Sequence, residues 1–321
     1  MTSGRPEDRD RRITSHLLAD LSEEARAIWE STAPPDPSRR RRSLHDTVHA
    51  RLSGVNRSLR TTKGGLPVHA GACLLPGGPG FLVAGRTGSG KSSLSALLAT
   101  VWGATLVSDD TVWLGAAGAA GIGAPLALRP GSPLWERARA LWHADDSARL
   151  LARTVDLEAP PVALAARVDR LLFPTYQPGT AQLACLPAAE AFGRLAGSVL
   201  RRCGERDMMD LAEVVGRCPA AAIAYPDAEA SLRLISEWLE ATPAAVPVEV
   251  QHLDTSMLRA AGLGLEVRGV RFDDDVVLWR PQLGRMLHLR GWLGGSLCHT
   301  PAWEELAASG FVGQQEERSD A

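Results

Sequence analysis

The sequence predicts an α/β fold, in which a mixed β-sheet with flanking helices surrounds a glycine-rich loop. It also predicts a helical N-terminal preface and a small β-rich C-terminal extension. Three observations predict the core: the glycine-rich stretch 85–92 follows a short apolar run, a leucine-rich segment comes directly after it, and residues 104–110 are again apolar. Strand, loop, helix and strand in this order begin an α/β unit. We expect residues 1–62 to be the preface, 63–241 the core domain and 242–321 the extension.

The preface contains one segment of helical periodicity, "SHLLADLSEEARAIWE" at 15–30. Its apolar residues share one helix face, which predicts a docking helix: Leu17, Leu18, Leu21, Ala25 and Ile28. The breaker "STAPPDPSRRRRS" follows at 31–43. Its arginine run 39–42 favours a solvated linker over a phosphate or acidic-peptide contact.

The core is expected to open with two strands, within 68–75 and 81–85, because the turn sequence "PGGPG" separates two apolar runs. A helix over 91–103 then carries its leucines on one face and closes at Gly103. Residues 104–110 and 111–117 read as extended segments. Further on, the pattern predicts a strand over 168–174 and helices over 186–202 and 227–241.

The C-terminal extension begins after "ATPAAVPVE" at 241–249, which has the composition of a linker. Residues 263–293 predict a small β meander followed by a short helix. The polar last dozen residues predict a disordered tail.

Composition excludes several classes of partner. The formal net charge is −2, so no global attraction to nucleic acid or to an acidic membrane is expected. No run of 18 apolar residues occurs and the N-terminus is polar, which predicts a cytoplasmic protein without a membrane span. The five cysteines are scattered without metal-ligand spacing, which indicates buried or half-buried reduced thiols.

Residues 85–92 satisfy the pattern G-x-x-x-x-G-K-[ST], with an apolar run before it and a helical pattern after it. In such a loop backbone N–H groups turn inward around a phosphate chain at the positive end of a helix dipole. Lys91 is one of two lysines in the chain, with Lys63, while 33 of the 35 Lys and Arg residues are arginine. A compact ammonium suits the outer phosphates, and the Ser92 hydroxyl suits Mg²⁺. The predicted nucleotide-binding residues are Gly85, Arg86, Thr87, Gly88, Ser89, Gly90, Lys91, Ser92 and Ser93.

Two adjacent carboxylates, Asp109 and Asp110, end the next apolar run, 18 and 19 residues after Lys91. In a fold of this kind they come to lie beside the loop. One carboxylate can hold a metal while the other accepts a proton from an attacking hydroxyl. The two aspartates at 145–146 and the three at 273–275 stand in polar, turn-like surroundings and are expected at the surface.

The order "VHAGACLL…GFLVAGRTGSGKSSLSALL…ATLVSDDTVWL" resembles the kinase domain of HPr kinase/phosphorylase and its short bacterial relatives. The resemblance is closest over 67–114 and looser to about 240. It implies an ATP- and Mg²⁺-dependent kinase. It also implies that Asp109 is the general base, that Asp110 supports the metal with Ser92, and that His69 lies close to the transferred phosphate.

The chain departs from that family in one respect. No "EIRG"-like signature lies between 111 and 160, and "LEVRG" at 265–269 comes far too late in the chain. Phosphorylase activity and HPr as the acceptor are therefore not implied. The short relatives, which include kinases of lasso and other modified peptides, imply a Ser hydroxyl on a peptide or small protein as the acceptor, in natural-product biosynthesis. HPr-kinase relatives also imply a homo-oligomer.

Three functions follow from the sequence. The first is the kinase. The second is a regulatory ATPase that hydrolyses nucleotide without an acceptor, although neither an "LSGGQ"-like nor an "NKxD"-like signature follows the loop. The third is a non-catalytic nucleotide sensor whose C-terminal extension captures a partner. That extension weakly resembles the peptide-recognising domain of the pyrroloquinoline-quinone D type; a plain β extension is the alternative.

Overall fold

The computed structural model describes residues 6–32, 43–132, 134–142, 149–242, 247–261, 263, 266–280, 285–290, 306 and 308. A mixed six-stranded sheet forms its centre, in the order β11-β12-β10-β3-β2-β4. β10 runs parallel to β3 and β12, whereas β2 is antiparallel to β3 and β4, and β11 is antiparallel to β12. The expectation of a mixed α/β core is thereby confirmed. The bounds of the strands are β2 Ala70–Leu74, β3 Gly80–Ala84, β4 Thr105–Ser108, β10 Arg170–Tyr176, β11 Gln182–Leu186 and β12 Ala220–Tyr225.

Helices cover both faces of this sheet, because its strands alternate apolar side chains between two hydrophobic cores. On one face Phe81 and Val83 pack with α4 (Lys91–Trp102) and α8 (Ala228–Ala241). On the other face Leu82 and Phe173 pack with α6 (Ala188–Ala196) and α7 (Glu205–Arg217). The loop that joins β3 to α4 is therefore held at the end of a strand that is buried on both sides.

Two smaller sheets complete the region around the central sheet. One has the order β1-β5-β6-β9, and the other pairs β7 with β8. Their bounds, with the nearby helices, are β1 Leu66–Val68, β5 Val112–Gly115, β6 Gly118–Ala120, β7 Leu126–Leu128, α5 Trp135–Trp142, β8 Leu150–Ala152, the 3₁₀ helix η1 Thr154–Leu157 and β9 Ala165–Ala166.

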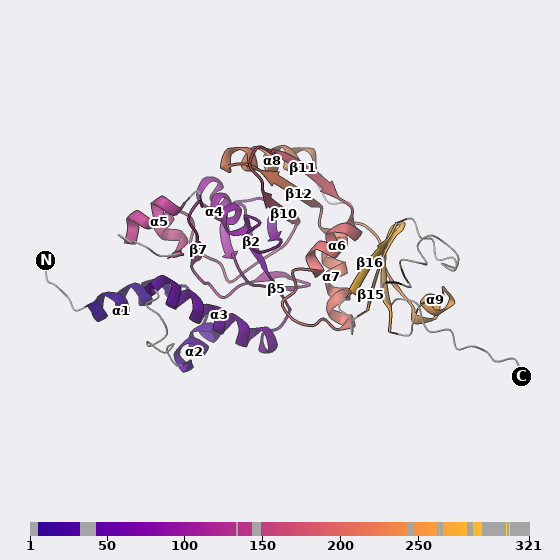
Figure 1. Ribbon diagram of the computed structural model, residues 1–321, viewed down its shortest axis with the longest axis horizontal. Coiled ribbons are helices and arrows are strands. Elements are labelled where there is room, and N and C mark those ends of the chain that lie inside the picture. The colour runs from indigo at the N-terminus through magenta and orange to yellow at the C-terminus, as the bar shows by residue number, and fades with distance from the viewer. Residues whose placement is uncertain are drawn as a thin grey trace, which may run out of the picture.

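Three N-terminal helices pack together against the core (Figure 1): α1 Pro6–Leu17, α2 Glu23–Ser31 and α3 Leu44–Thr62. The expected single helix over 15–30 is wrong, since the chain turns between α1 and α2, where the Ser22 hydroxyl caps α2 by accepting from the Ala25 N–H. Its apolar residues nevertheless share a hydrophobic cluster with Trp113 and Leu151 of the core. α3 was not expected. The arginine run 39–42 lies outside the described residues.

The C-terminal strands form an antiparallel sheet in the order β13-β14-β15-β16, beside the short helix α9. The expected meander is present. One further strand, β13, comes before it and directly follows the expected linker at 241–249. α6 and α7 lie between this sheet and the central strands (Figure 1), and Phe192 of α6 packs on Phe272 and Trp279. The bounds are β13 Val250–Leu253, α9 Thr255–Ala260, β14 Arg268–Phe272, β15 Asp275–Arg280 and β16 Arg285–Leu289. The expected helix and tail after residue 290 lie almost wholly outside the described residues.

Several local expectations are corrected. The helix expected over 186–202 ends at Ala196, and α7 follows as a second helix. Four described cysteines are free thiols, as expected, but Cys185 is exposed rather than buried. Asp275, expected at the surface, is half-buried and lies 3.1 Å from the His288 ring. The pair at 145–146 lies outside the described residues, and in the described part of the chain no helix is long and apolar enough to span a membrane.

Candidate active site

The loop after β3 turns sharply before α4 begins, and Gly90 makes that turn possible. Its φ of 97° lies in the left-handed region, and a Cβ there would stand 2.2 Å from the Tyr225 hydroxyl oxygen. That hydroxyl donates to the Gly90 carbonyl at 3.0 Å, and the Tyr176 N–H donates to the Ser89 carbonyl at 3.0 Å. The ends of β10 and β12 thus fix the loop from one side.

Lys91 is the first residue of α4, and its side chain folds back over the loop. Its ammonium donates to the carbonyls of Gly85 at 2.8 Å and Arg86 at 2.9 Å. Burial lowers the pKa of Lys91, and the negative charges of Asp110 and Asp109 oppose that shift. The ammonium is therefore held at the loop, next to two carboxylates.

Asp109 follows β4 and is a buried carboxylate, 5% exposed. One of its oxygens accepts from the backbone N–H of Ala127 in β7 at 3.3 Å, and it also accepts from the Ser92 hydroxyl. Burial, and then the charge of Asp110, raise the pKa of Asp109 to about 7, while the two hydrogen bonds act in the opposite direction. A carboxyl group in this environment can take up and release a proton near neutral pH.

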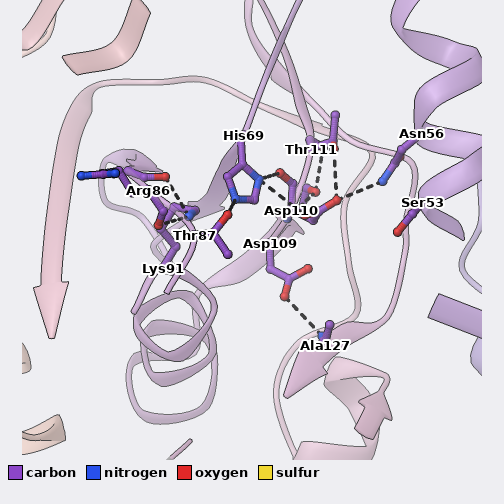
Figure 2. Close-up of polar contacts among 12 residues, drawn as sticks. Ser53, Asn56, His69, Arg86, Thr87, Lys91, Asp109, Asp110, Thr111 and Ala127 are labelled. Carbon is purple, nitrogen blue, oxygen red and sulfur yellow. Dashed lines mark hydrogen bonds and ion pairs between the residues drawn. The ribbon is translucent and has the colours of Figure 1, made fainter. Parts of the chain in front are cut away.

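Asp110 turns the other way, toward the N-terminal helices (Figure 2). Its carboxylate accepts from the Asn56 amide of α3 at 3.3 Å and from the Thr111 hydroxyl at 3.2 Å. The side chain keeps 45% exposure. It thus remains open to a further ligand while α3 holds its orientation.

His69 lies between Asp110 and the loop (Figure 2). Its Nδ1 is 2.9 Å from the Asp110 carbonyl oxygen and must carry the hydrogen, since a carbonyl only accepts. Its Nε2 is 3.4 Å from the Thr87 hydroxyl oxygen. Burial, and then the charge of Lys91, lower the pKa of His69, which favours the neutral ring with Nε2 as an acceptor.

These residues line one cavity of about 770 Å³. Of the predicted site residues it takes in His69, Thr87, Gly88, Gly90, Lys91, Ser92, Ser93, Asp109 and Asp110. Gly85, Arg86 and Ser89 do not line it, although the carbonyls of the first two hold the Lys91 ammonium.

Sequence reasoning missed seven further polar or aromatic residues of the cavity wall. They are His49, Arg129, Ser132, Arg149, Tyr176, Tyr225 and Asp227. One signal was available: the chain has two tyrosines, and both lie at this loop, where their rings meet edge to face at 6.0 Å between centroids. No sequence signal points to the other five.

The cavity suits a nucleotide with Mg²⁺. Ser92 and the Asp pair bring a hydroxyl and two carboxylates together, and oxygen donors of this kind are what Mg²⁺ binds. Among the described residues no group of three or more His, Cys, Asp or Glu is arranged to hold a metal, but Mg²⁺ usually takes one or two carboxylates together with substrate phosphates. The donor set therefore fits.

The fold and site define a phosphate-loop α/β protein. Neither a protein-family model nor a curated protein matches the sequence. Among solved structures, the chain is similar to the Hpr(Ser) kinase/phosphatase from Coxiella burnetii, with 14% identity and a TM-score of 0.30, over 56% of this chain and 99% of that one. At this identity the likeness concerns the fold alone.

Proposed function

We propose that the protein is an ATP- and Mg²⁺-dependent phosphotransferase that moves the γ-phosphate to a hydroxyl group. The observation that carries the proposal is the buried Asp109 carboxylate, which shares a cavity with the loop lysine and accepts from the hydroxyl of Ser92 beside it. A phosphate-binding loop alone binds nucleotide. A proton acceptor beside it supplies what transfer to a hydroxyl requires in addition.

In this mechanism the chain positions the reactants and moves one proton. Loop N–H groups and the Lys91 ammonium bind the β- and γ-phosphates, the ammonium exchanging its carbonyl acceptors for phosphate oxygens. Asp109 accepts the proton as the acceptor oxygen forms its bond to phosphorus, and the bond from phosphorus to the bridging oxygen of the leaving ADP breaks. Mg²⁺, when held by Asp110 and Ser92, supplies charge neutralisation on the phosphate oxygens. His69 positions Asp110 and Thr87 through its two ring nitrogens.

The acceptor belongs to the same proposal: a Ser hydroxyl on a peptide or small protein, in a peptide-modifying pathway rather than on HPr. What supports it is the sequence resemblance over 67–114, together with the absence of an "EIRG"-like signature between 111 and 160.

The test uses ATP labelled in the γ-phosphate and a library of Ser-containing peptides. We expect labelled peptide with the native protein, and a loss of about 10²-fold or more with Asp109→Asn, since a positioned base contributes roughly that factor. ADP should bind the variant with unchanged affinity. Asp274→Asn, at an exposed turn between β14 and β15, is the matched control and should transfer normally.

Three results would contradict the proposal in different ways. Full transfer by Asp109→Asn would overturn the base assignment. Label in inorganic phosphate and in none of the peptides would indicate the regulatory ATPase instead. Binding of ATP with neither product would indicate a nucleotide sensor.

A further inference from the structure

Two arginines stand side by side at the end of the β7–β8 pair. The register couples Leu128 with Leu150, so Arg129 and Arg149 occupy the next opposed positions, where side chains of antiparallel strands share a face. Both arginines line the cavity that contains Asp109. β7 also supplies the Ala127 N–H that holds Asp109, so this basic wall begins two residues from the contact to the proposed base.

Arg149 forms no direct ion pair with a carboxylate among the described residues. Its guanidinium lies 2.6 Å and 3.0 Å from the two ring nitrogens of His49 in α3. Burial, and then the charge of Arg149 itself, lower the pKa of His49, which favours the neutral ring, so His49 brings no negative charge to the guanidinium. Across the described residues, no carboxylate lies within 4.0 Å of either Arg129 or Arg149.

Arg149 is half-buried. Burial and then the neighbouring Arg129 lower its pKa, while the charges of Asp46, Asp110 and Asp109 oppose that shift from beyond ion-pair distance. Two like charges that share a partly desolvated wall and form no direct ion pair are costly, and a bound anion reduces that cost. Guanidinium groups bind carboxylates and phosphates through paired hydrogen bonds. The wall has the chemistry of an anion subsite.

We propose that Arg129 and Arg149 bind an acidic residue of the peptide acceptor, next to the hydroxyl that receives the phosphate. The inference rests on the proposed function. The nucleotide phosphates already have the loop amides and Lys91, whereas Asp109 bridges from Ser92 of α4 to β7. A hydroxyl that gives its proton to Asp109 therefore enters between the loop and the basic wall, and its flanking residues meet the two guanidiniums.

The experiment uses fluorescein-labelled Ser peptides in which one flanking position at a time is Asp or its uncharged counterpart Asn. Binding is measured by anisotropy with ADP and Mg²⁺ present, and transfer is measured separately with labelled ATP. We expect the native protein to prefer Asp at one position by about 10- to 100-fold, the worth of a charge-assisted hydrogen bond. Arg149→Gln and Arg129→Gln should each reduce that preference toward equality. Arg233→Gln, which removes an exposed guanidinium from α8, is the control and should keep it.

The two measurements separate the subsite from the function. If the native protein binds the Asp peptide preferentially, both variants lose that preference, and no transfer occurs, the subsite is supported and the kinase is wrong. Transfer with equal use of Asp and Asn peptides keeps the kinase and overturns the subsite, and an unchanged preference in both variants does the same. If Arg149→Gln loses transfer and ATP hydrolysis equally but keeps the Asp preference, the guanidinium serves the γ-phosphate and the subsite is wrong. If the native protein shows no peptide binding and no transfer, both the subsite and the kinase are wrong.

Discussion

Gly90 and Tyr225 form a contact whose strength a double-mutant cycle can measure. In Gly90→Ala the new Cβ would stand 2.2 Å from the Tyr225 hydroxyl oxygen and 3.2 Å from the ring carbon that carries it, at a φ of 97°. The left-handed backbone costs roughly 1–2 kcal/mol and the overpacking roughly 1–3 kcal/mol. Tyr225→Phe loses one hydrogen bond of 3.0 Å, about 1 kcal/mol, because the Gly90 carbonyl still accepts from the Leu94 N–H.

The double variant should be less destabilised than the sum of the single ones by roughly 1–2 kcal/mol, since phenylalanine lacks the oxygen nearest to the new Cβ. Urea unfolding followed by tryptophan fluorescence gives the four free energies. Tyr176→Phe is the matched control: the atom of Tyr176 nearest to that position is its Cβ, at 3.6 Å, which the substitution keeps, so its combination with Gly90→Ala should be additive. Additivity of the Tyr225 cycle to within about 0.5 kcal/mol would refute the contact.

Three further predictions test the site and its support. Asp109→Asn should raise the free energy of unfolding by at most about 4 kcal/mol above about pH 7, and by little near pH 4. The reason is that the folded-state pKa of Asp109 is raised, so ionising this carboxylate destabilises the native protein. That destabilisation is absent below the unfolded-state pKa and complete above the folded-state pKa. Urea midpoints across that range check it, and a constant difference would contradict it. Asn56→Leu should lower Mg²⁺-dependent turnover by about tenfold with ADP affinity unchanged, because Asp110 loses an amide donor. Steady-state kinetics measure the turnover and calorimetry measures the ADP affinity; an unchanged turnover would contradict the prediction. Gly123→Ala would bring a Cβ to 1.9 Å from the Asp20 carbonyl oxygen at a φ of 72°, and should loosen α1 and α2; unchanged hydrogen exchange in residues 6–32 would contradict this.

The loop and the Asp pair could be predicted because their signal is local. A glycine pattern after a strand fixes where a phosphate chain can bind, and a short strand after the helix returns the carboxylates to that loop. The roles assigned to Asp109, Asp110 and His69 stay predictions, although the structure brings all three into one cavity.

α3 shows how a visible signal can be missed. Val48, Leu52, Val55 and Leu59 recur at helical spacing and are buried, but they follow the breaker and arginine run that indicated a linker. α3 is therefore part of the site, since the Asn56 amide donates to the Asp110 carboxylate. Contacts of this kind depend on how distant segments pack, which no window of sequence contains.

The basic wall could not be predicted for a related reason. Arg129 and Arg149 meet only because two strands of three residues pair. Strands so short carry too few positions for an alternation to stand out. Residues 129–149, which include α5, also separate the two strands along the chain.

The cavity has an ammonium group at the loop and guanidinium groups at the β7–β8 pair. Lys91 is 5% exposed, and its ammonium donates to two loop carbonyls. At this position a compact point charge suits the phosphates better than the planar fork of a guanidinium. The wall formed by Arg129 and Arg149 has guanidiniums, whose paired donors suit a carboxylate that arrives with a substrate. The other lysine, Lys63, lies 5.4 Å from the centre of the Trp113 ring, where an arginine would serve as well. In a chain with 33 arginines, the geometry of the loop therefore accounts for the ammonium at position 91.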